Sequence, residues 1–198
     1  MKNYLVSQFG NPRGILGKLV GRIMAIKNRR RVLWTIEQLQ ISAQDKILEI
    51  GFGPGVAIRE ISKIIRNGTI AGIDHSKIML QQASRRNLQA IKSGRVDLKV
   101  GSSDSLPFPE NLFTKVFGIN VNIFGNDPSA NMKELKRVLE PRGKLAIVLQ
   151  PHWAKTEEAI QTISEKMVNQ FWNAGFSDVS LKSGKIRSET CLLVEGSK

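Results

Sequence analysis

Residues 46–55 read Lys-Ile-Leu-Glu-Ile-Gly-Phe-Gly-Pro-Gly, an apolar run followed by three glycines within five positions. The run is rich in isoleucine and leucine and predicts a buried strand. The glycines predict a tight turn into a helix that begins at Val56, because glycine adopts backbone conformations that other residues avoid. Such a turn lets backbone N–H groups approach a ligand that a Cβ atom would exclude. We therefore expect a ligand-binding loop at residues 49–55.

Outward from this loop, short apolar runs alternate with segments of helical periodicity, which is typical of a parallel sheet covered by helices. Strands are expected at 46–50, 69–74, 96–100, 115–120 and 144–150, and helices at 56–65, 76–91, 127–139 and 156–174. Two last strands, 178–182 and 190–195, flank a turn at Ser183-Gly184 and predict a hairpin at the sheet edge. The expected fold is α/β, a doubly wound, seven-stranded, mostly parallel sheet with a C-terminal antiparallel hairpin and N-terminal helices.

Composition limits the classes of site that the chain can build. It has 198 residues with one cysteine, Cys191, and two histidines, His75 and His152. An intrachain disulfide and a Cys/His zinc cluster are therefore excluded, and we expect no metal. The start of the chain lacks a signal-peptide pattern, and no apolar run approaches the ~20 residues that span a bilayer, so we expect a cytoplasmic protein. One domain, 1–198, is expected, with a core at 45–198.

The first 44 residues form a basic segment, with eight lysines and arginines against one acid, Glu37. Apolar residues recur at helical spacing from Ile15 to Met24, while Lys18 and Arg22 take the opposite face, which predicts a basic amphipathic helix. Three interpretations stay open. The helix is a lid, an interfacial helix on an anionic membrane that would admit a lipid acceptor, or a contact for nucleic acid or another polyanion. The net charge of +13 does not choose among them.

The spacing of the glycine loop excludes two common nucleotide sites. Counted from Gly51, the sixth position is Val56, so the dinucleotide fingerprint is not met, and the Gly-Lys-Ser/Thr of a P-loop is missing. Glu49 precedes the first glycine by two residues. A carboxylate there repels phosphates and favours a positively charged ligand. S-adenosylmethionine carries both a sulfonium and an ammonium group.

Residues 47–55 resemble motif I of the class I S-adenosylmethionine-dependent methyltransferases, and residues 72–76, Gly-Ile-Asp-His-Ser, are similar to the family's ribose-binding segment. Residues 134–145 and 173–176 also resemble family segments, so the resemblance covers about residues 45–196. It implies a Rossmann-like methyltransferase fold, S-adenosyl-L-methionine as cofactor and S-adenosyl-L-homocysteine as product. Asp74 would bind the ribose hydroxyls, and His75 and Met79 would line the adenine.

One segment departs from the family pattern. Residues 101–108 are similar to Gly-Asp-Ala-x-x-Leu-Pro-Phe, but Ser102 stands where the family has the Asp that contacts adenine. The serine hydroxyl could take that role, or Asp104 could reach across from a register two residues away. The residues expected to bind the cofactor are Glu49, Gly51, Phe52, Gly53, Gly55, Asp74, His75, Met79, Ser102, Ser103 and Asn120.

The acceptor is expected above the carboxyl ends of the fourth and fifth strands. Methyl transfer from a sulfonium needs mainly alignment, so a base is not obligatory. His152 is the candidate general base; the alternative is a surface histidine in a loop. Residues 120–124, Asn-Val-Asn-Ile-Phe, differ from the Asn-Pro-Pro-Tyr of enzymes that methylate base nitrogens or glutamine. The expected pocket residues are Asn122, Phe124, Gln150 and Trp153.

The function expected from these residues is methyl transfer to an O or N atom of a small organic or lipid-like acceptor, with peripheral contact to an anionic membrane as a further expectation. Two alternatives stay open. One is a non-catalytic binder of S-adenosylmethionine or S-adenosylhomocysteine, which would retain cofactor without forming product. The other is an RNA methyltransferase that uses the basic N-terminal face, whose RNA binding would weaken steeply with salt.

Overall fold

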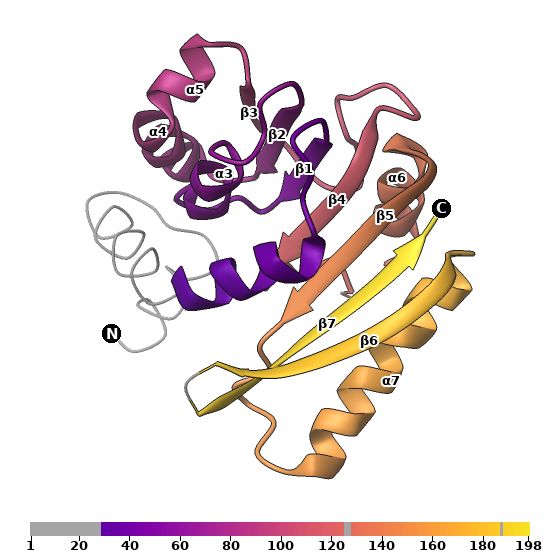
Figure 1. Ribbon diagram of the computed structural model, residues 1–198. Helices are drawn as coiled ribbons and strands as arrows, with labels where there is room; N and C mark the ends of the chain where they lie inside the picture. Colours follow the sequence, from indigo (N-terminus) through magenta and orange to yellow (C-terminus); the bar gives the residue numbers. More distant parts are fainter. Residues whose placement is uncertain (1–28, 125–127, 187) are drawn as a thin grey trace. The chain divides into compact units, whose positions relative to one another are not determined.

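The computed structural model describes residues 29–124, 128–186 and 188–198 (Figure 1). Its seven strands form one sheet in the order β3-β2-β1-β4-β5-β7-β6. The pairs β1–β2, β2–β3 and β4–β5 are parallel, and β5–β7 and β6–β7 are antiparallel. The predicted fold class, a mostly parallel sheet with a C-terminal antiparallel hairpin, is confirmed. Two compact units divide the chain after Ser102, and each is described by itself.

The first unit carries the glycine loop. Its strands are β1 (Lys46–Ile50), β2 (Thr69–Asp74) and β3 (Val96–Val100), and its helices are α3 (Val56–Ile61), α4 (Lys77–Arg86) and α5 (Leu88–Lys92), preceded by helical residues at 29–39. Ile47, Leu48 and Ile73 are buried, as expected for parallel strands covered on both faces. The core of this unit therefore holds the carboxyl ends of β1 and β2 in fixed register.

Two helices of the first unit are shorter than predicted. The predicted helix 56–65 ends at Ile61, where the Ser62 hydroxyl donates to the carbonyl of Arg59 and the chain turns. The predicted helix 76–91 is divided at Asn87 into α4 and α5. The Asn87 side-chain amide donates to the carbonyls of Ala83 and Gly55, so a contact outside the helix interrupts it.

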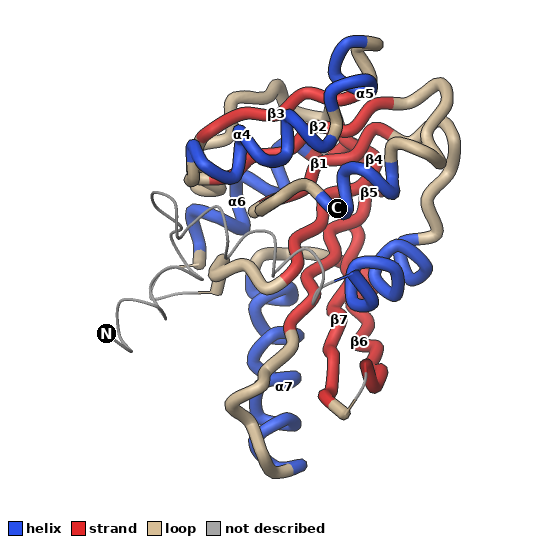
Figure 2. The backbone as a smooth tube through the Cα atoms, turned by 90° about the vertical axis from the view of Figure 1, so that its left-hand side faces the viewer, coloured by secondary structure: helices blue, strands red, loops and turns tan. Residues whose placement is uncertain are grey.

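The second unit contains β4 (Phe113–Ile119), β5 (Leu139–Leu149), β6 (Ser177–Ile186), β7 (Glu189–Ser197), α6 (Ser129–Val138) and α7 (Glu157–Asn173). The long helix α7 runs beside the β6–β7 hairpin (Figure 2) and buries Phe171 against it. Thr156 caps α7, because its hydroxyl accepts from the Ala159 amide at 3.2 Å. The cap fixes the start of α7, where the loop that follows β5 ends.

The second unit differs from the prediction at two places. The fifth strand was expected at 144–150, but β5 already begins at Leu139, and an irregularity within it shifts the pairing with β4 and gives Arg142 a φ of 65°. The Ser183-Gly184 turn lies inside β6, paired with Leu192 and Cys191. The antiparallel ladder continues past the glycine to Ile186, so pairing with β7 overrides the local turn preference.

Several predictions concern the start of the chain. The basic amphipathic helix predicted around Ile15 to Met24 lies outside the described residues. Across the three described ranges, no helix is long and apolar enough to cross a membrane. Within the same ranges, no group of three metal-ligating side chains is gathered.

Candidate functional site

The glycine loop after β1 is built around left-handed backbone. Gly51, Gly53 and Gly55 have φ values of 67°, 50° and 74°, which favour glycine. The Gly51 amide donates to the carbonyl of Ile73 at 2.7 Å and so ties the loop to β2. A Cβ atom added at Gly53 would lie no closer than 4.0 Å to the carbonyl oxygen of Gly51, its nearest neighbour. The loop therefore offers backbone beside open space that a side chain would fill.

Asp74 orders this loop from the end of β2. Its Oδ2 accepts from the Gly53 amide and its Oδ1 from the Ser76 amide, each at 2.8 Å. The side chain is 6% exposed. Each carboxylate oxygen has a second lone pair, so Asp74 can still accept from ligand hydroxyls while it holds the loop. The hydrogen bond from Gly53 joins Asp74 to the glycine loop, and the role of Asp74 at the ribose stays a prediction.

Glu49 is a buried acid with an unpaired oxygen. It is 3% exposed, and its Oε2 has no hydrogen-bond partner among the described residues. Burial, and then the nearby charge of Asp74, raise the pKa of Glu49 well above its usual range, although a hydrogen bond from the Ile58 amide opposes this. Two buried acids beside a glycine cradle suit a ligand with cationic and hydroxyl groups. The residues present therefore fit the sulfonium, ammonium and ribose groups of S-adenosylmethionine.

Two residues at the end of α4 hold the glycine loop through hydrogen bonds to its carbonyls. The sequence did not single out either residue. Arg86 donates to the carbonyl of Pro54, and the Asn87 amide donates to the carbonyl of Gly55 at 3.1 Å. Burial, followed by the charge of Arg59, lowers the pKa of Arg86. No local pattern marks these contacts, because donor and acceptor are 32 residues apart.

The other cofactor residues predicted in the first unit differ in exposure. Phe52 and Met79 are buried, at 3% and 2% exposed, and so belong to the core in this state. His75 is exposed, with its Nδ1 3.8 Å from Asp74 Oδ1. Ser102 is exposed at the end of the segment after β3. The roles of these four residues in cofactor binding stay predictions.

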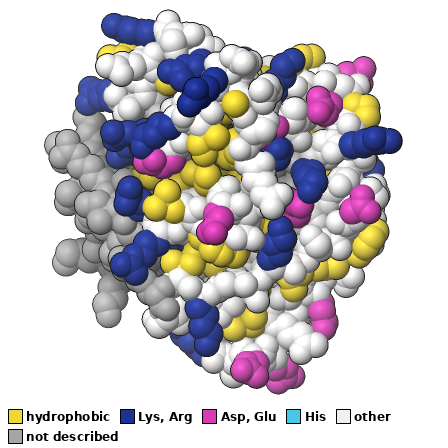
Figure 3. Space-filling view, viewed as in Figure 1, with side chains coloured by type: hydrophobic (Ala, Val, Ile, Leu, Met, Phe, Trp, Pro, Cys, Tyr) yellow, Lys and Arg dark blue, Asp and Glu magenta, His cyan; other side chains and the backbone are white. Residues whose placement is uncertain are grey.

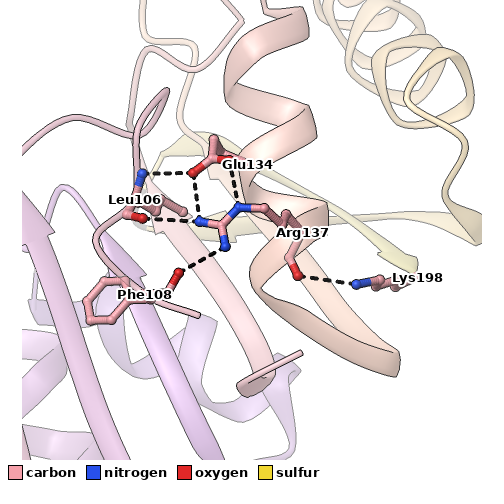
Figure 4. Close-up of polar contacts among 5 residues, drawn as sticks. All are labelled: Leu106, Phe108, Glu134, Arg137 and Lys198. Atoms are coloured by element: carbon pink, nitrogen blue, oxygen red, sulfur yellow. Dashed lines mark hydrogen bonds and ion pairs between the residues drawn. The ribbon is translucent and has the colours of Figure 1, made fainter. Parts of the chain in front are cut away.

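In the second unit, an ion pair on α6 holds the loop before β4 (Figure 4). Arg137 makes a two-point contact with Glu134, at 2.7 and 2.9 Å. The same guanidinium donates to the carbonyls of Phe108 and Leu106, and the Leu106 amide donates to Glu134 at 2.9 Å. Two side chains about one turn apart on α6 thereby fix the backbone of the segment that resembles the family's Leu-Pro-Phe.

Ser103 and Asp104 precede that segment. The Ser103 hydroxyl lies 2.6 Å from Asn131 Oδ1 on α6, so this serine is engaged by the protein itself. Asp104 is exposed. Asn131 is a further residue that the sequence did not single out, because nothing in its own neighbourhood marks a partner 28 residues away.

Glu134→Gln should lower the free energy of unfolding by about 1–2 kcal/mol at pH 7. Arg137 holds the pKa of Glu134 at about 2, below its usual value of 4.5. The depressed pKa means that this stability is present above pH 4.5 and is lost as the pH falls toward 2. Urea unfolding of both proteins between pH 7 and pH 3 measures the difference. A constant difference across that range would contradict the assignment, and Glu165→Gln on α7 is the matched control.

The carboxyl ends of β4 and β5 are joined by Asn120. Its Oδ1 accepts from the Gln150 amide at 2.8 Å, and its φ of 55° is left-handed, which asparagine tolerates better than most residues. After β5, His152 and Trp153 form an edge-to-face pair with ring centroids 5.1 Å apart. Both are exposed, and Trp153 retains 58% of its surface. The loop thus presents an imidazole and an indole together.

The remaining residues predicted for the acceptor pocket differ in their exposure and in their contacts. Gln150 is buried and Asn122 is exposed. Phe124 packs against Phe171 of α7, with ring centroids 6.4 Å apart, so at least part of its role is ordinary packing. The structure therefore brings together Asn120 with Gln150 and His152 with Trp153, and the pocket itself stays a prediction.

Comparison with known proteins agrees with this geometry. The family model of the methyltransferase domain matches residues 48–147, about half of the chain. The chain is also 35% identical over 181 residues to the uncharacterized methyltransferase YdaC of Bacillus subtilis (strain 168), and the match covers 91% of this chain and 98% of that protein.

Solved structures share the fold. An S-adenosylmethionine-dependent methyltransferase from Aquifex aeolicus superposes with a TM-score of 0.64 and 19% identity, over 84% of this chain and 88% of the other. Phosphoethanolamine N-methyltransferase 2 of Haemonchus contortus, in complex with S-adenosyl-L-methionine, gives a TM-score of 0.66 and 17% identity, over 85% of this chain and 52% of that chain. At such identities the likeness concerns the fold alone.

Proposed function

The chain belongs to the family of S-adenosylmethionine-dependent methyltransferases, and on that premise we propose that it methylates an O or N atom of a small organic or lipid-like acceptor. The observation that carries the cofactor part is the buried oxygen of Glu49 beside the glycine loop, which has no hydrogen-bond partner among the described residues. The exposed pair His152–Trp153 supports the acceptor part. A turnover assay that follows S-adenosylhomocysteine formation with small phenols, amines and lipid vesicles tests both.

Glu49, the loop at 51–55 and Asp74 would hold the cofactor. When bound, S-adenosylmethionine supplies a methyl group activated by the sulfonium. Glu49 would neutralise the ammonium of the methionine end, which also relieves the cost of its own buried charge. Asp74 would accept from the ribose hydroxyls with the lone pairs that Gly53 and Ser76 leave free. Transfer then depends on alignment of the acceptor atom more than on acid or base chemistry.

His152 and Trp153 would receive the acceptor. An exposed indole offers flat apolar surface to an aromatic ring or an acyl chain. The imidazole beside it can remove the proton that an attacking hydroxyl or amine loses. A small acceptor is favoured because Asn120 to Phe124 lacks the Asn-Pro-Pro-Tyr of enzymes that act on base nitrogens.

His152→Asn should lower kcat by about tenfold to a hundredfold once an acceptor is found, because general base catalysis contributes at least that much. The KM for S-adenosylmethionine should stay unchanged. Lys155→Gln, in the same loop, is the control for a nonspecific effect. A wild-type kcat in His152→Asn would leave His152 as a surface residue.

A non-catalytic binder of the same cofactor is the second candidate function. Ser102 in place of the family's adenine-contacting Asp supports it, because that contact is weaker or lost. Such a protein would bind S-adenosylmethionine and S-adenosylhomocysteine and yield no product with any acceptor. Figure 3 shows lysine and arginine side chains on one face of the protein, with acids among them. The alternative of an RNA methyltransferase depends on the basic N-terminal segment, most of which lies outside the described residues, so it stays a prediction.

A further inference from the structure

A groove of about 590 Å³ lies between α6 and the C-terminal end of α7, within the second unit. Its surface is mostly apolar. Met132, which is 2% exposed, and Ala174 contribute to the floor. None of the site residues predicted from the sequence lines it.

Among the described residues, the side-chain charges that line the groove have one sign. Ten described residues line it; four are cations, Lys133, Lys136, Arg137 and Lys198, and none has an acidic side chain. Arg137 is paired with Glu134, which does not line the groove. The groove therefore joins apolar walls to a positive edge.

The lysines of the groove form no salt bridge within the described ranges. Lys136 donates to the carbonyls of Ala174 and Gly175, and Lys198 donates to Asn111 Oδ1 and to carbonyls on α6 and β5. These partners are neutral, so they orient the ammonium groups without cancelling them. Lys133 is exposed, and its charge contributes to lowering the pKa of Glu134. An anion at this edge would meet an exposed ammonium group.

The size of the groove favours a small occupant. Its volume falls within the ~300–1,000 Å³ of small-molecule sites, whereas a stable protein interface needs ~20–30 residues on each side. Ten residues line this groove. We propose that it binds a single-chain amphiphile with a carboxylate headgroup, a free fatty acid, whose chain lies on the Met132 floor and whose carboxylate meets Lys133. This site is independent of the methyl-transfer site.

Calorimetric titration of the full chain with dodecanoate, kept below its micelle concentration, tests the proposal. We expect saturable binding of one dodecanoate per chain, and no comparable binding of dodecyltrimethylammonium, whose chain is the same length and whose charge is opposite. Lys133→Gln should weaken dodecanoate binding about three- to tenfold through the loss of a charge-assisted hydrogen bond. Lys166→Gln, an exposed lysine of α7 that does not line the groove, should leave it unchanged.

A second variant tests the chain-binding floor. Gln170→Trp places an indole in the groove and should reduce dodecanoate binding at least tenfold, while thermal unfolding verifies that the variant folds. Equal weakening by Lys133→Gln and Lys166→Gln would show nonspecific attraction to a basic protein and would overturn the proposal. Unaltered binding in Gln170→Trp, equal binding of both amphiphiles, or no dodecanoate binding would overturn it as well.

Discussion

Glu49→Gln should make the ligand-free protein more stable and the cofactor complex weaker. Glu49 is buried with one unpaired oxygen, and its pKa is raised by burial and by Asp74. A raised pKa means that the fold loses stability as the pH rises from the usual range of a glutamate through the raised value. The neutral amide removes that loss, so we expect the melting temperature to rise by a few degrees at pH 7.5, about 1 kcal/mol or more.

The same variant should bind S-adenosylmethionine about 5- to 150-fold more weakly, which corresponds to roughly 1–3 kcal/mol for a hydrogen bond to a charged group. Thermal melts give the change in melting temperature, and calorimetry on the same preparation gives the change in affinity. The stability gain should shrink below pH 4.5, where Glu49 is protonated in both folded and unfolded wild-type protein. Glu60→Gln on α3 is the control. A loss of stability together with wild-type affinity would contradict the role given to Glu49.

Asp74→Ala should weaken both the fold and cofactor binding. The substitution leaves the amides of Gly53 and Ser76 without their acceptor. Two charge-assisted hydrogen bonds from partly buried amides correspond to about 2–4 kcal/mol of unfolding free energy. The ribose hydroxyls would lose their acceptor too, so we expect affinity for S-adenosylmethionine to fall by about 1–3 kcal/mol beyond any effect on folding.

Asp74→Asn separates the two roles, because the amide keeps one acceptor oxygen for the loop. We expect Asp74→Asn to regain part of the stability and little of the cofactor affinity. Urea unfolding gives the first quantity and calorimetry below the melting temperature gives the second. Ser76→Ala, which removes the cap on the Met79 amide and keeps the Asp74 carboxylate, is the control. Full cofactor affinity in Asp74→Ala would contradict the ribose assignment.

Strands with strong local signals were predicted well. The bounds of β1, β2 and β3 match the prediction residue for residue, because Gly51, Asp74 and Gly101 mark where the three strands end. The C-terminal hairpin was predicted as an element, but its turn was misplaced at Ser183-Gly184. The length of β6 depends on how far β7 continues to pair with it, and no local residue encodes that distance.

In the candidate site, too, the residues with a local sequence signal were predicted, and those held by distant contacts were not. The glycine loop and Asp74 were predicted because their spacing along the chain carries the signal. Arg86 and Asn87 act on the loop through side-chain contacts to carbonyls 32 residues away. The pair Glu134–Arg137 likewise acts on carbonyls and an amide 28 to 31 residues away. Such contacts depend on tertiary packing, so they became visible only in the structure.

The most direct test is calorimetric titration of the purified protein, stripped of any retained ligand, with S-adenosylmethionine, S-adenosylhomocysteine and NADH. The residues at 49–55 and Asp74 predict micromolar binding of the first two and no binding of NADH, with the affinity of both lowered in Glu49→Gln. Absence of binding by S-adenosylmethionine, or equal affinity for it in Glu49→Gln and wild type, would contradict the assignment of the cofactor to this loop.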